Sequence, residues 1–176
     1  MQLCLDKTNH TMEDVVYTKN GKPCFRYGGT YFNLSHSGEF TVCVLSDKEA
    51  GVDLEKTNHF EDRLANFVYH RQEREYIQKN YDQPDEGFTF LWTVKESIMK
   101  YFGTGLSLDP KKIHIDLSDP VSAVCDEYDC RSLHFTKYDL EGYALTVCSE
   151  SEQFSVGYSR VILPPGGAVP GKLLCF

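Results

Sequence analysis

Short alternating segments in the first third of the chain predict β-strands. They comprise residues 31–35 (YFNLS), 40–46 (FTVCVLS) and 50–55 (AGVDLE), which are rich in β-branched and aromatic residues. The polar links HSGE and SDKE separate them. Before them, residues 18–30 carry Asn-Gly, Lys-Pro and Gly-Gly pairs, which predict turns. Further strands are expected at 112–117, 132–138, 143–149 and near 154–162.

Helical spacing of apolar residues predicts two helices between these strands. The first follows Thr57 or Asn58, and its expected stripe is Phe60, Leu64, Phe67, Val68 and Tyr76. The polar run 79–87 ends it. The second covers about 88–102, and Gly103 stops it. Its inner stripe is expected to be Leu91, Val94 and Ile98, with Tyr101 or Phe102. Helices among antiparallel-type strands predict an α+β fold.

Composition narrows the class of protein. The 176 residues, 41% hydrophobic and 25% charged, suit a soluble domain with a real core. Eighteen basic and 26 acidic residues give a net charge of −8, which argues against a nucleic-acid-binding protein. The apolar runs are too short to span a membrane, and the first residues do not resemble a signal peptide. We therefore expect a cytoplasmic protein whose seven cysteines are reduced.

Two acids interrupt the apolar strand at 50–55. On a strand, Asp53 and Glu55 point to the same side, about 7 Å apart along the chain, while Val52 and Leu54 face the core. Carboxylates on one face repel each other unless a proton or a cation lies between them. The pair indicates either a metal site or simply the exposed side of a half-buried strand.

The second predicted helix carries another candidate group. Lys95 and Glu96 fall on its flank, and Lys100 lies one turn beyond Glu96, about 6 Å along the axis. Glu96 and Lys100 could form an ordinary surface ion pair. Alternatively, Glu96 is a third metal carboxylate flanked by two ammonium groups, which suits a diphosphate bound with Mg²⁺.

Ser35 and His36 close the first strand and offer a third candidate. A serine hydrolase is not indicated, because adjacent strand residues point to opposite faces and a G-x-S-x-G elbow is missing. His36 is either a polar cap or, with Ser35, part of an anion site. A zinc site of Cys125, Cys130 and His134 is not favoured, because the spacing is loose and a fourth ligand is not evident.

Three segments together resemble one family. FNLSHSG (32–38), GVDLEK (51–56) and FLWTVKESIMKYFGTGLSL (90–108), in this order and spacing, are similar to the 4′-phosphopantetheinyl transferases. The larger, surfactin-synthetase-activating type fits better than the short type. NGKP (20–23) and EGYALTVCS (141–149) extend the likeness over about residues 20 to 150.

The resemblance implies an activity and a set of site residues. The 4′-phosphopantetheine arm of coenzyme A would pass, with Mg²⁺, to a serine of an apo acyl or peptidyl carrier protein, releasing 3′,5′-ADP. The implied metal ligands are Asp53, Glu55 and Glu96. Lys100 would contact the pyrophosphate, and Glu73 falls where some members carry a carboxylate proposed to deprotonate the serine. The implied coenzyme A contacts are Lys22, Ser35, His36, Lys95 and Lys100.

One departure from the family concerns the first lobe. Larger members have a first lobe related to the second by a pseudo-twofold axis, whereas only about 30 residues precede the first motif here. We expect residues 1–30 to be a remnant of that lobe and a linker, 31–162 the transferase domain, and 163–176 a C-terminal tail. The cleft could be completed in a homo-oligomer. Alternatively, the chain is a weak or inactive member that binds coenzyme A or a carrier protein, or another Mg²⁺-dependent phosphate enzyme.

Overall fold

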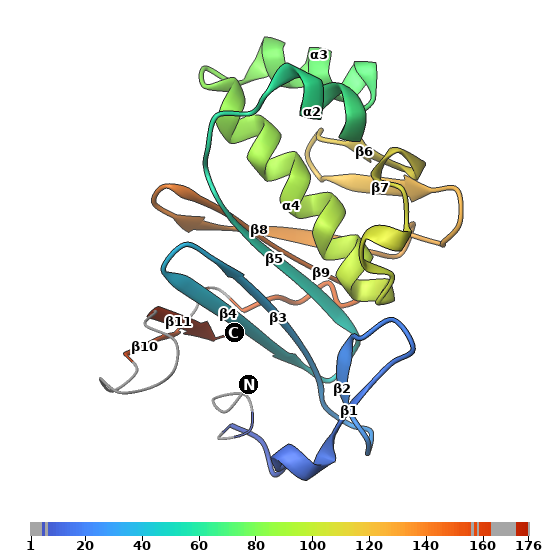
Figure 1. The fold of residues 1–176 in the computed structure, drawn as a ribbon, viewed down its shortest axis with the longest axis vertical. Coiled ribbons are helices and arrows are strands. Elements are labelled where there is room, and N and C mark those ends of the chain that lie inside the picture. Colours follow the sequence, from blue (N-terminus) through green and yellow to red (C-terminus); the bar gives the residue numbers. More distant parts are fainter. Residues whose placement is uncertain (1–4, 6, 156, 158, 163–171, 176) are drawn as a thin grey trace.

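Two β-sheets and one long helix form the frame of the molecule (Figure 1). The computed structural model describes residues 5, 7–155, 157, 159–162 and 172–175. One sheet has the strand order β10-β11-β4-β3, and the other has the order β5-β9-β8. Their bounds are β3 Tyr31–Ser37, β4 Phe40–Ser46, β5 Ala50–Lys56, β8 His134–Leu140, β9 Tyr143–Ser149, β10 Ser159–Ile162 and β11 Lys172–Cys175. The predicted α+β class, with helices packed on mainly antiparallel strands, is confirmed.

Smaller elements surround this frame. Two short antiparallel pairs are β1 Val15–Tyr17 with β2 Pro23–Phe25, and β6 Ile113–Asp116 with β7 Ser122–Cys125. Single 3₁₀ turns are η1 Met12–Asp14, η2 Gly105–Ser107 and η3 Pro110–Lys112. The predicted strands at 31–35, 40–46, 50–55 and 143–149 agree with β3, β4, β5 and β9 to within two residues at each end. β1, β2 and β7 were not predicted.

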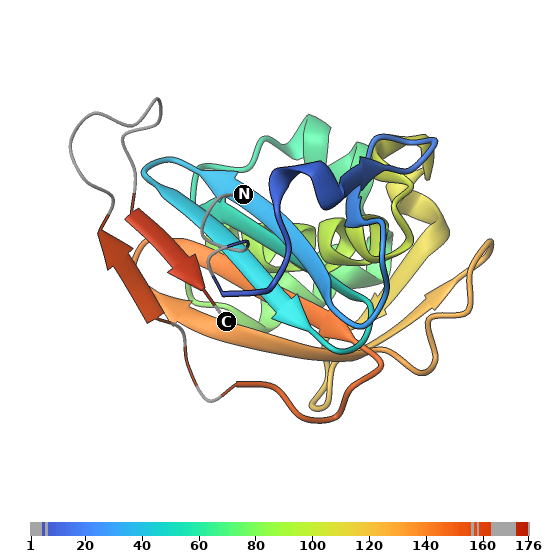
Figure 2. The ribbon, with the colours of Figure 1, turned by 90° about the horizontal axis from the view of Figure 1, so that it is seen from below.

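Apolar side chains fill the space between the two sheets. Val42 and Val44 of β4 pack in one buried cluster with Val52 and Leu54 of β5 and with residues of β8 and β9. Figure 2 shows β3 and β4 side by side, with the β10–β11 pair at their outer edge. Because Val52 and Leu54 face this cluster, the residues that alternate with them on β5 face α4 on the other side.

The helix α4, Pro84–Phe102, runs along β5 and β9 (Figure 1). It begins with a proline and two acids in its first turn, both favourable at a helix N-terminus. It ends at Gly103, whose φ of 67° lies in the left-handed region that favours glycine. Leu91, Val94 and Ile98 are fully buried, so the predicted inner stripe is confirmed. The helix starts within the run 79–87 that was predicted as a loop.

The first predicted helix is in fact two, α2 Asp62–Val68 and α3 Arg71–Asn80. The break comes at His70, whose side chain accepts the backbone N–H of Glu73 while the Glu73 carboxylate accepts the His70 N–H at 2.7 Å. The predicted stripe is therefore wrong in part: Val68 is buried, but Leu64 and Phe67 are exposed. Ala65 and Ile77 are buried in their place.

β3 and β5 join the two sheets through side chains. The Val52 N–H donates to Asn33 Oδ1 at 3.0 Å, the Leu54 N–H to Ser35 Oγ at 3.1 Å, and the Lys56 N–H to Ser37 Oγ at 3.0 Å. The residue numbers increase in the same direction along β3 and β5, so the two strands run parallel. We call these three contacts the side-chain rungs. They give the β5 edge hydrogen-bond partners that a neighbouring backbone would otherwise supply.

Two expectations need correction outside the centre of the fold. Residues 172–175, expected in a loose tail, form β11, which pairs in parallel with β4. Residues 163–171 and 176 of that expected tail lie outside the described residues. Cys43 is disulfide-bonded, so the expectation that every cysteine is reduced is wrong. Cys24, Cys125, Cys130 and Cys148 are free thiols.

Candidate functional site

Asp53 lies between β3 and α4 and is only 2% exposed. Its Oδ1 accepts hydrogen bonds from the Ser35 hydroxyl at 2.9 Å and from Lys100 Nζ at 2.6 Å. Lys100 Nζ also donates to Ser35 Oγ at 2.9 Å. The Asp53 Oδ2 atom is buried and has no hydrogen-bond partner. A buried carboxylate thus has one oxygen held by a cation and a hydroxyl, and one oxygen left unsatisfied.

Glu55 and Glu96 share the electrostatic environment of Asp53. Burial raises the pKa of Glu55, and the negative charge of Asp53 raises it further. Burial, followed by the charge of Asp53 and a smaller effect of Glu55, raises the pKa of Glu96 to about 7, although Lys100 opposes the shift. Asp53 and Glu55 alternate with Val52 and Leu54, which face the cluster between the sheets, so the two acids share the side of β5 that faces α4. Burial first, and then the negative charge of Asp53, raise the pKa of Glu55 and of Glu96 and so favour their protonated forms.

The carboxylate oxygens of this group are the type of ligand that a hard cation prefers. Within the described residues, no three Asp, Glu, His or Cys side chains gather closely enough to count as a preformed metal site. However, the unsatisfied Asp53 Oδ2 is the kind of buried polar atom that an ion explains, and carboxylate oxygens are the ligands that Mg²⁺ prefers. The donor set therefore fits Mg²⁺ by its chemistry. Metal ligation by Asp53, Glu55 and Glu96 remains a prediction.

Lys22 and Lys100 line one cavity of about 220 Å³, between the 20–23 turn, β3 and the end of α4. Lys22 Nζ donates to Glu49 Oε1 at 2.6 Å and to the Tyr101 carbonyl at 2.7 Å. The stem of Lys22 also packs against Gly103, where an added Cβ would lie 3.0 Å from Lys22 Cδ. Two of the predicted coenzyme contacts, far apart in the sequence, are thus brought to one cavity.

Ser35 and His36 point in different directions, as expected for neighbours on a strand. Ser35 is buried, and its hydroxyl accepts from Leu54 and Lys100 and donates to Asp53. Its hydrogen-bonding capacity is spent, so the structure gives it a role toward Asp53 rather than toward a phosphate. His36 is exposed, and it slightly opposes the rise in the pKa of Glu55. A phosphate contact by His36 remains a prediction.

Lys95 and Glu73 lie on another side of α4, and their expected roles need correction. Lys95 is fully buried, and its Nζ donates to Glu73 Oε2 at 3.0 Å and to the carbonyls of Val68, Pro110 and Ile113 at 2.9–3.1 Å. Glu73 is 5% exposed and also accepts the Ile115 N–H at 2.9 Å. Burial lowers the pKa of Lys95, and the Glu73 carboxylate opposes this. Neither side chain is free to contact coenzyme A or to deprotonate a substrate.

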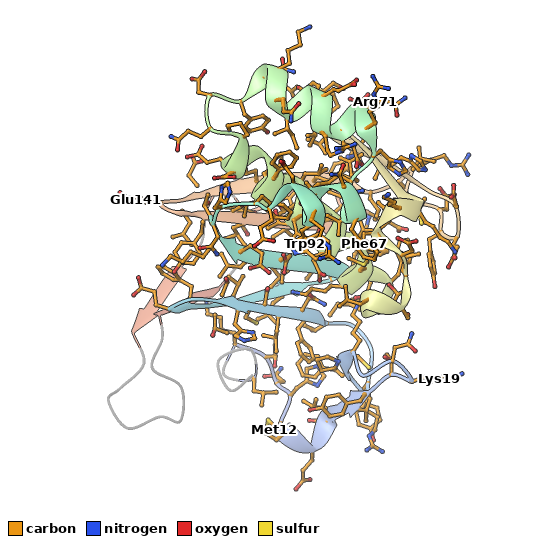
Figure 3. All side chains as sticks on the ribbon, turned by 45° about the horizontal axis from the view of Figure 1, so that its top comes forward. Met12, Lys19, Phe67, Arg71, Trp92 and Glu141 are labelled. Carbon is orange, nitrogen blue, oxygen red and sulfur yellow. The ribbon has the colours of Figure 1, made fainter. Side chains whose placement is uncertain are left out.

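A second cavity, of about 300 Å³, begins at Glu55. Its walls are largely apolar and include Phe60, Leu64 and Trp92. Figure 3 shows Trp92 and Phe67 in the region where α2 lies over α4. Phe67 is 70% exposed. The acidic group is thus flanked by a cavity containing two lysines on one side and by an apolar cavity on the other.

Two hydrogen-bonding residues of β3, one beside the acids and one that only joins the strands, were not predicted. Ser37 donates to Glu55 Oε2 at 3.1 Å, and Asn33 forms the first side-chain rung. A signal for both was available, because Asn33, Ser35 and Ser37 alternate along one side of the predicted strand.

Comparisons with known proteins bear on the same residues. A model of the 4′-phosphopantetheinyl transferase superfamily matches residues 49–148, which include Asp53, Glu55 and Glu96. The chain is 30% identical over 157 residues to "4′-phosphopantetheinyl transferase Sfp" of Bacillus subtilis (strain 168), covering 87% of this chain and 69% of that protein.

Two further relatives carry the same description. The chain is 29% identical over 141 residues to "4′-phosphopantetheinyl transferase gsp" of Aneurinibacillus migulanus, covering 78% of this chain and 59% of that protein. It is 33% identical over 109 residues to "4′-phosphopantetheinyl transferase AcpT" of Salmonella typhimurium, covering 58% of this chain and 56% of that protein. The matches thus cover less than two thirds of both of these relatives.

Proposed function

The chain belongs to the 4′-phosphopantetheinyl transferase superfamily, and on that premise we propose that it transfers the phosphopantetheine arm of coenzyme A to a carrier protein. The acceptor would be a serine of an apo acyl or peptidyl carrier protein, and 3′,5′-ADP would leave. The observation that carries the proposal is the buried Asp53, which is bound by Lys100 through one oxygen, is left with one unsatisfied oxygen, and raises the pKa of Glu55 and Glu96 by its charge.

The donor fits the side of the site that holds the two lysines. Lys100 lies at the junction of its cavity and the acidic group, so it can neutralise pyrophosphate charge. Lys22 lines the same cavity and would be a further phosphate contact. Its ammonium group would then divide its hydrogen bonds between the phosphate, Glu49 and the Tyr101 carbonyl. Asp53, Glu55 and Glu96 would hold Mg²⁺, which when bound supplies charge neutralisation on the phosphate oxygens.

The acceptor serine would approach from the apolar cavity at Glu55. The serine proton must leave as the oxygen attacks, and we do not assign Glu96 to take it, because its carboxylate would hold Mg²⁺. The Glu73 carboxylate, buried against Lys95, has no part in this step. Phe60, Leu64 and Trp92 would exclude water from the side where the arm is transferred.

A mass measurement tests the proposal directly. The protein is incubated with coenzyme A, Mg²⁺ and an apo carrier protein, and the intact mass of the carrier is followed. We expect a gain of one phosphopantetheine arm, and we expect no gain with Asp53→Asn. An unchanged carrier mass together with measurable coenzyme A binding would favour the alternative of an inactive binding protein. An unchanged mass without binding would refute both.

The cellular location and the oligomeric state of the protein are also proposals. In the described residues, no helix is long and apolar enough to cross a membrane. We propose a cytoplasmic location, which the four free thiols support and the disulfide at Cys43 opposes. Self-association also stays a proposal.

A further inference from the structure

Two serines of β3 repeat one arrangement toward β5. The Ser35 hydroxyl accepts the Leu54 N–H at 3.1 Å and donates to Asp53 Oδ1 at 2.9 Å. Two residues later, the Ser37 hydroxyl accepts the Lys56 N–H at 3.0 Å and donates to Glu55 Oε2 at 3.1 Å. In both cases one hydroxyl bonds a backbone N–H and the carboxylate of the residue just before it.

Asn33 forms the third rung without a carboxylate. Its Oδ1 accepts the Val52 N–H at 3.0 Å, and the residue before Val52 is Gly51, which has no side chain. The rung at Asn33 therefore joins the strands in the same way but has no acid to orient. Asn33 therefore only joins β3 to β5, whereas Ser35 and Ser37 join the strands and also hold an acid.

The serine bonds decide which carboxylate oxygen stays available. A hydroxyl whose lone pair accepts a fixed N–H has its proton free to point at the neighbouring acid. Asp53 Oδ1 is taken by Ser35 and Lys100, and Oδ2 is left buried without a partner. The Ser37 bond likewise occupies Glu55 Oε2. Each acid is thus held by one oxygen.

We propose that Ser35 and Ser37 are positioning residues that present one oxygen each of Asp53 and Glu55 to a bound divalent cation. The inference rests on the proposed function, because it assumes that these acids bind metal. Outer partners of this kind commonly change metal affinity about 10- to 100-fold when they are removed. The role differs from a phosphate contact, since the hydroxyl protons are directed at the protein's own carboxylates.

Binding of Mn²⁺ alone, measured from the electron paramagnetic resonance signal of the free ion, tests the proposal. We expect Ser37→Ala to raise the Mn²⁺ dissociation constant about 10-fold. Ser37→Thr keeps the hydroxyl and suits a strand, so its dissociation constant should stay close to the parent value. Asn33→Ala removes a rung without touching an acid and serves as the matched control, with affinity near the parent.

The folded state is checked by thermal unfolding of each variant, and Ser37 is favourable here because it lies at the partly exposed end of β3. Ser35→Ala, measured in the same way, should also weaken Mn²⁺ binding. Parent-like affinity in both alanine variants would overturn the positioning role while leaving the metal site intact. Equal weakening of Mn²⁺ binding by Asn33→Ala would overturn it as well, because the effect would then come from loss of a side-chain rung between β3 and β5 and not from the orientation of an acid. A parent protein that does not bind Mn²⁺ would refute the metal site itself and, with it, this inference.

Discussion

Lys95 is held in the interior by the Glu73 carboxylate and three backbone carbonyls. Removing one partner of a buried ion pair leaves an uncompensated charge, at a cost of about 3–5 kcal/mol. We therefore expect Lys95→Met to lower the free energy of unfolding by that amount in urea denaturation. The exposed Lys19, changed to Met, should alter it by less than about 0.5 kcal/mol. A parent-like value for Lys95→Met would show that the pair does not stabilise the fold.

Glu96 makes the stability of the metal-free protein depend on pH. Its pKa is about 7 in the folded protein, against an ordinary value of 4.5. Between these values the unfolded chain loses the proton and the folded protein keeps it, so the free energy of unfolding falls as pH rises from about 4.5 to 7. One proton accounts for at most about 1.4 kcal/mol per pH unit.

Urea denaturation without metal at several pH values, compared with Glu96→Gln, isolates this effect. The parent-minus-variant difference should fall from pH 5 to pH 7 and then level off. A difference that stays constant or rises over this window would mean that Glu96 is not shifted upward.

At the residue level the sequence located the acids but not their partners. The alternation of Val52 and Leu54 with Asp53 and Glu55 was enough to predict that the acids share one side. The position of Lys95 could not be predicted in this way. Its place beside Glu96 on the helix flank gave no sign of burial, whereas α3 covers it with a carboxylate and α2, η3 and β6 cover it with carbonyls. Such burial depends on elements distant in the sequence.

At the scale of elements, the contact between β5 and α4 is close at one glycine. A Cβ added to Gly51 would lie 2.0 Å from the Ser97 carbonyl oxygen and 2.7 Å from the Tyr101 nitrogen, both in the helix backbone. Only a residue without a side chain permits this approach. The approach sets the distance between the strand that carries Asp53 and the helix that carries Glu96 and Lys100.

Gly51→Ala should therefore move the helix away from the strand. We expect a loss of about 1–3 kcal/mol in the free energy of unfolding, because overpacking against backbone is not easily relieved. The rate of phosphopantetheine transfer should also drop, even under conditions in which Gly51→Ala remains folded. Gly28→Ala is the matched control, since an added Cβ there meets nothing within 4 Å, and its stability should be unchanged. A stable and active Gly51→Ala protein would contradict the geometry.

Elements with strong local signals were predicted well, and those defined by unusual caps were not. The inner stripe of α4 and the bounds of β4 and β9 follow from residue spacing alone. The break between α2 and α3 depends on His70 acting as the cap, and histidine is not among the residues that normally signal a helix start. The pairing of β11 with β4 joins residues far apart in the sequence and leaves no local pattern.

At the scale of the whole molecule, charge should shape the encounter with a carrier protein. We expect the carrier to be acidic, while this chain has a net charge of −8, so attraction must come from a local basic surface. Lys95 cannot contribute because it is buried, and Arg71 and Lys112 already pair with Glu75 and Glu127. The remaining basic surface near α3 and η3 includes Arg74 and Lys111.

A salt series of carrier affinity tests this surface. We expect affinity to fall modestly as salt rises, because exposed attraction is screened. Lys111→Ala should weaken binding at low salt, and Lys19→Ala, as the control, should not. An affinity that rises with salt would mean that the net negative charge dominates and that the docking surface lies elsewhere.

The side-chain rungs also affect how this protein can change over generations. A backbone ladder is indifferent to the residues it connects, but the junction of β3 and β5 is encoded at positions 33, 35 and 37. A single codon change at any of these positions can remove or lengthen one rung while the backbone hydrogen bonds within both sheets stay in place. The spacing between the acids and the neighbouring sheet is therefore open to gradual selection, one inherited substitution at a time.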